Sequence, residues 1–328
     1  MNPHAPSVLI LGAHGRLGTA SSHAFAKAGW RVRAQTRRAS TDWPKGVELV
    51  QVDAMQADAL CRAAQGVDVI VNALNPLYTE WERLARPLAA NALAAAKASG
   101  ALLMFPGNVY NFGQTLPGEL HLDTPQVGNT SKARIRIEIE QQMHTAAASG
   151  VNSVVVRAGD YFGGGGRGSW FDLVIVKSLA KGKIVYPGPT DLAHTWAYLP
   201  DFAQTFVRLA ALYKQSGTQL HGIQHFHFAG HAPTGVELHR ALETASGRSL
   251  RLSQLPWSLI RLAAPFSPML RASLEMRYLW QRPHVMDDSA LRSLLGDVPH
   301  TPLQSALAGA LTALGLPSAH PLPASRRD

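Results

Sequence analysis

A glycine-rich turn between an apolar run and a helical run constrains the fold of this chain more than any other feature. Residues 8–11 are continuously apolar, Gly12, Gly15 and Gly18 follow at three-residue spacing, and a helical pattern then runs to about Ala28. Such glycines let the backbone turn sharply and approach a diphosphate at the helix N-terminus. A simple tight turn is the alternative, and it leaves the strand-to-helix context unexplained.

The rest of the first half repeats this alternation of strands and helices. Further strands are predicted at 30–36, 47–52, 67–72, 101–105 and 151–157, with helices at 55–65, 80–98 and 131–148. Continuously apolar strands that alternate with helices pair in parallel and are covered on both faces. The predicted fold is therefore α/β, a Rossmann-type doubly wound parallel sheet whose ligand lies at the carboxyl ends of the strands.

The periodicity weakens after Gly163, where four consecutive glycines mark a loop able to close over a ligand. We expect residues 1–163 to form the dinucleotide-binding Rossmann domain. Residues 164–316 are predicted to form a smaller C-terminal α+β substrate lobe, from which the chain can recross to the sheet. Residues 317–328 are predicted to be a disordered tail.

Charge and composition exclude several classes of protein. The net charge is +9, but the basic residues are scattered, so we expect no nucleic-acid partner. The single cysteine, Cys61, excludes an internal disulfide framework. The most membrane-like run, 257–270, is interrupted by Arg261, Pro265 and Pro268. With no basic signal-peptide start either, the chain is predicted to be cytoplasmic and without a membrane partner.

The end of the second strand bears on the choice of dinucleotide. An acidic residue there binds the ribose of NAD, whereas an arginine accommodates the 2′-phosphate of NADP. This chain has Arg37 and Arg38 and no acid at that place, and Arg16 in the glycine loop is a further cation. NADP(H) is therefore favoured over NAD, unless the arginine pair is only a solvated turn. Asp53, after the third strand, is placed either to bind the adenine amino group or to cap the next helix.

Taken together, these features resemble the short-chain dehydrogenase/reductase superfamily, and most closely its extended branch of NAD-dependent epimerase/dehydratase proteins. The resemblance runs from about Ser7 to Gly315. It is specific only in five patches, which are residues 12–18, 105–113, 132–138, 156–163 and 194–201.

In that superfamily a Tyr-x-x-x-Lys pair transfers the proton and holds the nicotinamide ribose. The matching window here ends at Lys132, but Gly128 stands at the tyrosine position, and the usual Ser/Thr falls near Asn108. We therefore expect an atypical member that keeps nucleotide binding and lacks this tyrosine. The resemblance and the loop together predict these cofactor-binding residues: Gly12, Gly15, Arg16, Leu17, Gly18, Arg37, Asp53 and Lys132.

Another residue could supply the proton. Tyr110 follows the fifth strand, and a cation such as Lys132 would lower its pKa, unless the ring is only a wall of the pocket. Asn108 could orient a carbonyl. Lys132, Tyr110 and Asn108 are thus the predicted catalytic residues. Arg136 lies one helical turn after Lys132 and could anchor an anionic substrate, or it could be a solvated helix residue.

Two further residues are predicted to bind substrate. Tyr161 follows the sixth strand, and His194 begins a run that, by resemblance, contributes to the substrate pocket. His225 and His227 would share one face of a strand, but no acidic ligand is nearby and no metal site is predicted.

The leading functional hypothesis is an NADP(H)-dependent oxidoreductase that transfers a hydride to or from a small carbonyl or alcohol substrate. Gly128 keeps open a catalytically silent NADP(H) sensor that regulates a partner. Nucleotide-sugar epimerisation or dehydration is the third hypothesis, disfavoured by the missing acid after the second strand. The resemblance also implies a possible homodimer.

Overall fold

The structure is a computed structural model, and it describes residues 5–37, 43–44, 46–216 and 220–319. Its centre is a seven-stranded sheet in which every neighbouring pair is parallel, in the order β11-β7-β5-β4-β1-β2-β3. The strands are β1 Ser7–Leu11, β2 Arg31–Thr36, β3 Val47–Gln51, β4 Val69–Asn72, β5 Leu102–Asn108, β7 Ser153–Ala158 and β11 Ile223–Phe228. This confirms the predicted doubly wound α/β fold.

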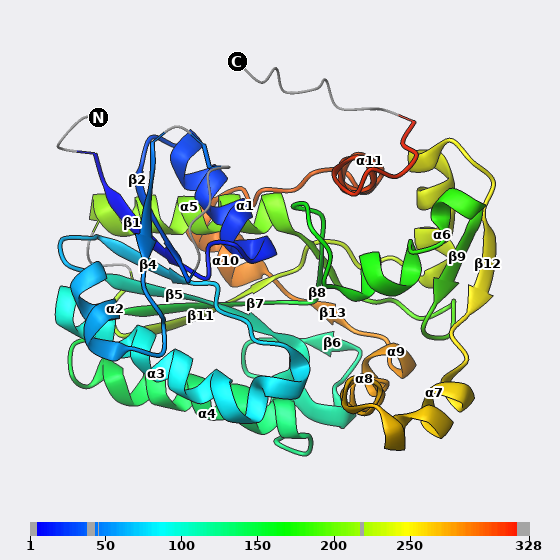
Figure 1. The fold of residues 1–328 in the computed structure, drawn as a ribbon, viewed down its shortest axis with the longest axis horizontal. Coiled ribbons are helices and arrows are strands. Elements are labelled where there is room, and N and C mark those ends of the chain that lie inside the picture. The colour runs from blue at the N-terminus through cyan, green and yellow to red at the C-terminus, as the bar shows by residue number, and fades with distance from the viewer. Residues whose placement is uncertain (1–4, 38–42, 45, 217–219, 320–328) are drawn as a thin grey trace.

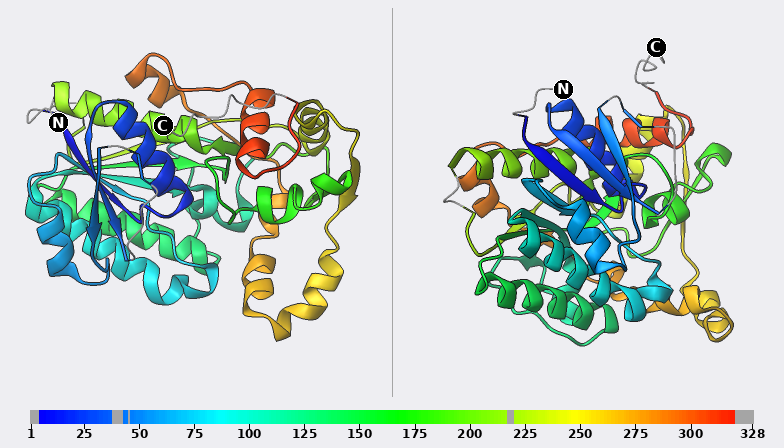
Figure 2. Two further views of the ribbon diagram at one scale, coloured as in Figure 1. Left: turned by 45° about the horizontal axis from the view of Figure 1, so that its top comes forward. Right: turned by 60° about the vertical axis from the view of Figure 1, so that its left-hand side comes forward.

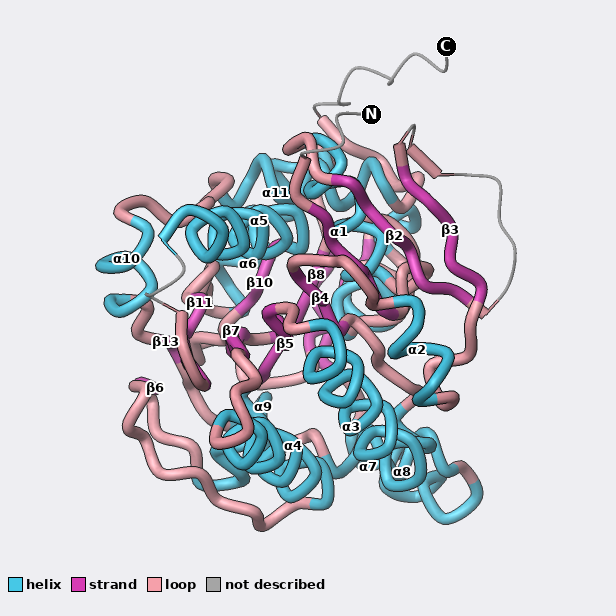
Figure 3. Tube along the Cα trace, turned by 90° about the vertical axis from the view of Figure 1, so that its left-hand side faces the viewer, coloured by secondary structure: helices cyan, strands magenta, loops and turns pink. Residues whose placement is uncertain are grey.

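Helices cover both faces of this sheet (Figure 1). One layer holds α2 (Ala57–Ala63), α3 (Trp81–Ser99) and α4 (Ser131–Ala147), and the other holds α1 (Arg16–Lys27), α5 (Leu199–Ser216) and α10 (Ser289–Leu295). Figure 3 shows the sheet between these two layers. Alternate residues of β1 enter different cores, because Leu9 and Leu11 pack with α3 while Val8 and Ile10 pack with α1 and α5. A strand buried on both faces has to be apolar throughout, as the sequence predicts.

A smaller lobe lies beyond the carboxyl ends of the strands (Figure 1). It contains the parallel pair β9 (Lys183–Tyr186) and β12 (Arg251–Gln254), and the packed helices α6 (Gly235–Ser246) and α11 (Leu303–Ala313). Its other elements are the π-helical turn η3 (Phe171–Ile175), η4 (Leu179–Lys181), α7 (Trp257–Ala263), η5 (Ala264–Phe266), α8 (Pro268–Glu275) and α9 (Tyr278–Gln281). The left view of Figure 2 shows this lobe beside the sheet and its helices.

The chain crosses between the two parts more than once. After β8 (Asp160–Phe162) enters the lobe and pairs with β10 (Trp196–Tyr198), α5 and β11 return to the Rossmann body. The strand β6 (Glu119–Leu120) likewise forms a parallel pair with a strand far along the chain, β13 (Val285–Met286). Within residues 164–316 the chain thus recrosses to the sheet, since the edge strand β11 belongs to the main sheet.

The end of the described chain packs on the lobe. The Ala319 amide donates a hydrogen bond to the Ala245 carbonyl at 2.8 Å, so residues 317–319 of the predicted tail are ordered, and residues 320–328 lie outside the described part. None of the described helices is long and apolar enough to cross a bilayer.

Candidate functional site

The glycine loop forms a tight cradle at the start of α1. Gly12 has φ of +72°, in the left-handed region that favours glycine. A Cβ atom on Gly18 would lie 2.7 Å from the Ala13 Cα and closer still to the Gly12 carbonyl oxygen. Gly15 caps α1 without a side-chain hydrogen bond, so the first amides of this helix keep their hydrogen-bonding capacity. This geometry fits a dinucleotide diphosphate, which approaches the backbone closely and accepts from helix N–H groups.

Gln35 holds the cradle against the sheet. Its Oε1 accepts from the Gly12 amide at 2.8 Å, and its Nε2 donates to the Val52 carbonyl at 2.6 Å. The side chain is buried at the carboxyl end of β2. Sequence reasoning gave Gln35 no role, although a polar residue within an apolar strand was the available signal.

Of the arginines expected around a 2′-phosphate, Arg16 is paired with residues of the protein itself. Arg16 points towards the lobe, where its Nη2 donates to the Gly163 carbonyl at 3.0 Å and its Nη1 lies 3.6 Å from Asp172. Desolvation lowers the pKa of Arg16, and the Asp172 charge opposes this. Arg16 is thus engaged within the protein, and its place beside a 2′-phosphate stays a prediction. Arg37 is exposed directly after β2, and Arg38 lies outside the described residues.

Asp53 is exposed in the turn before α2. Its Oδ1 accepts from the Met55 amide at 3.0 Å, which is the capping role that the sequence offered as one of two alternatives. A contact with adenine stays a prediction. Leu17 lies in the first turn of α1 and packs into the core on that face of the sheet.

The lysine of the expected Tyr-x-x-x-Lys window is buried, and the tyrosine position is not beside it. Helix α4 begins at Ser131 with Thr130 as its N-cap, so Gly128 precedes the helix. A Cβ on Gly128 would face the Arg134 side chain at 3.2 Å. Positions 128 and 132 therefore do not share a helix face, because the first of them is not helical.

Lys132 is engaged by a residue from the lobe. Its side chain is 3% exposed, and its Nζ lies 2.6 Å from Glu275 Oε2 at the end of α8. Glu275 Oε1 also accepts from the Ser131 amide at 2.8 Å, so this carboxylate binds both the N-terminus of α4 and the lysine. These contacts lower the Glu275 pKa although partial burial opposes them. Sequence reasoning missed Glu275, which is 143 residues away from Lys132.

Two tyrosine hydroxyls meet beside this lysine. Tyr78, in the short helix η1 (Tyr78–Glu80) after β4, lies with its hydroxyl 2.7 Å from that of Tyr110, and the Lys132 Nζ is 5.0 Å from the Tyr78 ring centroid. Tyr110 belongs to η2 (Val109–Thr115), and its amide donates to Asn108 Oδ1 at 3.0 Å. Asn108 thus caps η2. Sequence reasoning missed Tyr78, because no local pattern brings the loop after β4 to Lys132.

Desolvation dominates the acidity of this tyrosine pair. It raises the pKa of Tyr78 to about 12, and the negative charge of Asp160 adds to the rise, while the hydrogen bond with Tyr110 and the Arg136 charge oppose it. The pKa of Tyr110 is raised well above its usual value, first by burial and then by Tyr78 and Asp160. The expectation that a nearby cation lowers the Tyr110 pKa is therefore wrong, because burial and the neighbouring Tyr78 and Asp160 raise it.

His194 and Asp160 form a second polar pair at this end of the sheet. His194 Nε2 lies 2.9 Å from Asp160 Oδ2, and both side chains are largely buried. The imidazole stacks on the Trp280 indole with ring centroids 4.1 Å apart and planes 6° apart, and His284 is edge-on at 4.6 Å. The ring of His194 is thereby fixed in one orientation towards Asp160.

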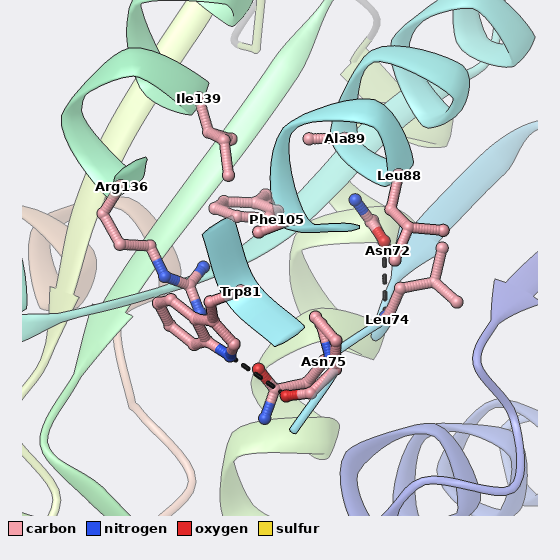
Figure 4. Close-up of a pocket in the computed structure, with 11 residues that line it drawn as sticks. Asn72, Leu74, Asn75, Trp81, Leu88, Ala89, Phe105, Arg136 and Ile139 are labelled. Atoms are coloured by element: carbon pink, nitrogen blue, oxygen red, sulfur yellow. Dashed lines mark hydrogen bonds between the residues drawn. The ribbon is translucent and has the colours of Figure 1, made fainter. Parts of the chain in front are cut away.

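Arg136 lies in a small cavity between α3, α4 and the end of β5 (Figure 4). The guanidinium carbon is 4.8 Å from the Trp81 ring centroid and 5.1 Å from that of Phe105, and Nη1 donates to the Pro106 carbonyl at 3.2 Å. Nε is buried without a partner, and no carboxylate in the described chain is within ion-pair distance. The cavity of about 20 Å³ has room for a water molecule. Desolvation lowers the pKa of Arg136.

Tyr161 completes this region. Its hydroxyl donates to the Gly107 carbonyl at 3.2 Å, and burial raises its pKa. Tyr110, Lys132, Arg136, Tyr161 and the His194 pair thus gather over the carboxyl ends of β5 and β7, while the glycine cradle lies at the end of β1. A dinucleotide that lies across the reversal of strand order between β1 and β4 would connect the two groups.

The histidines of β11 lie apart from this region. His225 Nε2 is 3.3 Å from Glu140 Oε2, and His227 Nδ1 is 3.1 Å from the Leu120 carbonyl oxygen. In the described part of the chain no three His, Cys, Asp or Glu side chains are grouped as metal ligands would be.

Comparison with solved structures shows the same fold over nearly the whole chain. A Burkholderia cenocepacia protein described as an epimerase is similar with a TM-score of 0.75 and 17% identity, over 96% of this chain and 99% of that one. A UDP-glucose 4-epimerase from Stenotrophomonas maltophila with bound NAD gives 0.72 and 15%, over 94% and 96%. A Bacillus cereus UDP-glucuronic acid 4-epimerase with bound NAD gives 0.72 and 15%, over 94% and 99%.

No curated protein sequence matches the chain. A family model does match, over residues 8–221, which include the glycine cradle, Tyr78, Tyr110, Lys132 and the sixth strand of the sheet. The match covers about two thirds of the chain and confirms the resemblance to the epimerase/dehydratase branch. The chain belongs to the NAD-dependent epimerase/dehydratase family.

Proposed function

We propose that this protein is an NADP(H)-dependent oxidoreductase that transfers a hydride between the nicotinamide and a carbonyl or alcohol carbon of a small substrate. The family makes a nicotinamide dinucleotide the expected cofactor. The preference for NADP(H) is supported by Arg37 at the end of β2, where an NAD site carries an acid. Gly12, Gly15 and Gly18 would hold the diphosphate, and Lys132 would hold the nicotinamide ribose.

The Tyr78–Tyr110 hydroxyl pair is the observation that carries this proposal. Both hydroxyls are protonated at neutral pH, and their hydrogen bond would stabilise the phenolate that forms when one of them gives up its proton, although burial, which raises both pKa values, opposes that step. A bound dinucleotide would supply the hydride for a carbonyl carbon, and the Tyr78 hydroxyl would give its proton to the carbonyl oxygen. The Tyr110 hydroxyl would then donate a hydrogen bond to the Tyr78 phenolate, and the Lys132 ammonium lies over the Tyr78 ring, 5.0 Å from its centroid.

Three residues would select and orient the substrate. Arg136 would bind an anionic group, because it has no acidic partner within ion-pair distance in the described chain. Tyr161 would bound the pocket beside the end of β5. His194, with its ring fixed by Asp160 and Trp280, would donate a hydrogen bond to a substrate oxygen.

The experiment is NADPH oxidation by the purified protein with a panel of small aldehydes and ketones, some of which carry a carboxylate. Tyr78→Phe should lower kcat by about 100-fold or more, the usual contribution of a general acid, with the NADPH Kd unchanged. Tyr213→Phe is the matched control, since its hydroxyl only accepts from Asn152 at 3.5 Å. Tight NADPH binding with no turnover on the whole panel would refute the proposal.

A second candidate is a sensor that binds NADP(H) without turnover. The specific observation in its favour is that Lys132 is paired with Glu275, while position 128 lacks a tyrosine. Tyr78→Phe would then leave every measured property unchanged. Recovery of tightly bound NAD with the purified protein would instead favour nucleotide-sugar epimerisation or dehydration.

A further inference from the structure

The hairpin of α7, η5 and α8 carries an unusual share of the exposed apolar surface. Eight large apolar side chains of the described residues are exposed, and four of them lie within eleven consecutive positions of this hairpin. These four are Leu259, Leu262, Phe266 and Met269, with exposed fractions of 63%, 74%, 89% and 41%. The left view of Figure 2 shows the hairpin projecting from the lobe, away from the sheet and its helices.

The hairpin also carries two arginines, and further arginines lie in the segments beside it. Between positions 251 and 282 the chain has five arginines and a single acid, Glu275, which is already paired with Lys132. Arg261 and Arg271 are exposed on α7 and α8, and neither lies within ion-pair distance of a carboxylate in the described chain. Apolar side chains and unpaired arginines on one projecting element are the combination that binds an anionic lipid interface.

The base of the hairpin is fixed to the lobe. The Trp257 indole donates to the Pro187 carbonyl and packs against Trp170, and the Arg277 guanidinium lies 5.7 Å from the Trp257 ring. The exposed side chains are therefore presented by an anchored element, with Phe266 at the turn between α7 and α8.

From these observations we propose that the α7–α8 hairpin docks the protein on an anionic membrane surface, with Leu262 and Phe266 inserted at the level of the headgroups. A second copy of this chain fits less well, because each copy has a net charge of +9 and would bring Arg261 and Arg271 to the same surface. The sequence predicted no membrane partner, because its most apolar run is interrupted and its basic residues are scattered, and this proposal departs from that expectation. Neither helix is long enough to span, and an interfacial element does not need to be.

The test is flotation of the full-length protein with vesicles of phosphatidylcholine alone or mixed with phosphatidylglycerol. We expect binding to the mixed vesicles only, weakened by salt. The variant with Arg261→Gln and Arg271→Gln should lose roughly 30-fold in affinity, because each arginine at an anionic surface contributes about fivefold. Leu262→Ser with Phe266→Ser should lose at least about tenfold. Leu122→Ser, at an exposed leucine outside the hairpin, is the control and should bind as the wild type does.

All four hairpin side chains named in these variants are exposed, so the variants should fold, which circular dichroism and the NADPH Kd will verify. Absence of flotation with the mixed vesicles overturns the proposal, as does equal flotation of the Leu262/Phe266 variant. A wild-type dimer that the same variant converts to a monomer, without vesicle binding, would assign the surface to self-association instead. The assay needs no turnover, so its failure is separate from failure of the proposed function.

Discussion

Replacement of Gly18 by alanine tests the diphosphate cradle directly. The added Cβ would lie 2.7 Å from the Ala13 Cα, and the Gly12 carbonyl carbon would be 2.9 Å away. All three of its nearest neighbours are backbone atoms, which cannot rotate aside as a side chain can. Since carbon atoms pack at about 3.5–4.0 Å, the start of α1 would have to move by roughly 1 Å away from the loop.

The size of the effect follows from this displacement. Overpacking of this kind costs about 1–3 kcal/mol of folding free energy. The shift also moves the first amides of α1 away from the diphosphate, and a hydrogen bond to a charged group contributes about 1.5–3 kcal/mol. Loss of one such bond would raise the NADPH Kd by roughly 10- to 150-fold.

The assay is calorimetric titration with NADPH, together with urea unfolding of the protein without ligand. Gly118→Ala is the matched control, because Gly118 is outside the left-handed region and a Cβ there would meet no atom within 4 Å. It should leave both measurements unchanged. If Gly18→Ala binds NADPH with the Kd of the wild type and unfolds at the same urea concentration, the cradle assignment is refuted.

Two further predictions concern buried charges. Glu275→Gln should tighten NADPH binding, because the Lys132 ammonium is released from its ion pair. The same change should lower the urea midpoint, because it leaves the buried ammonium without a partner. Weaker NADPH binding would argue against Lys132 as a ribose ligand. Burial would raise the Glu140 pKa, but contacts with His225 and Arg157 lower it to about 2. The ionised Glu140 carboxylate therefore contributes roughly 3 kcal/mol to the free energy of unfolding. This contribution is complete above about pH 4.5 and is lost as the pH falls towards 2. Urea unfolding across this range should show a steeper acid loss for the wild type than for Glu140→Gln, and parallel curves would contradict this.

The local pattern of the chain was sufficient for the sheet and the cradle. Six of the seven strands of the sheet occur in the first half where the apolar runs predict them, and α1 follows Gly12–Gly18 as expected. The helix from Thr234 to Gly247 was also predictable, because its capping residues are local signals. His225 and His227 were expected to lie on a strand, but the place of that strand beside β7 was not predicted.

The chemistry of the site was less accessible from the sequence. The window around Lys132 directed attention to Gly128, whereas the structure brings Tyr78, Tyr110 and Glu275 to the lysine. Arg16 was assigned to the cofactor phosphate by its position in the loop, and the structure pairs it with Asp172. In each case the deciding partner lies far along the chain or on a loop without periodicity.

The sequence by itself determined the order of strands and helices, the glycine turn and the absence of an acid after β2, because each of these depends on residues within a few positions of one another. The tertiary structure alone decided which side chains meet at the carboxyl ends of the strands, how far their pKa values move and which apolar residues stay exposed. These properties depend on contacts and burial between segments such as η1, α4 and α8, and no spacing along the chain encodes them.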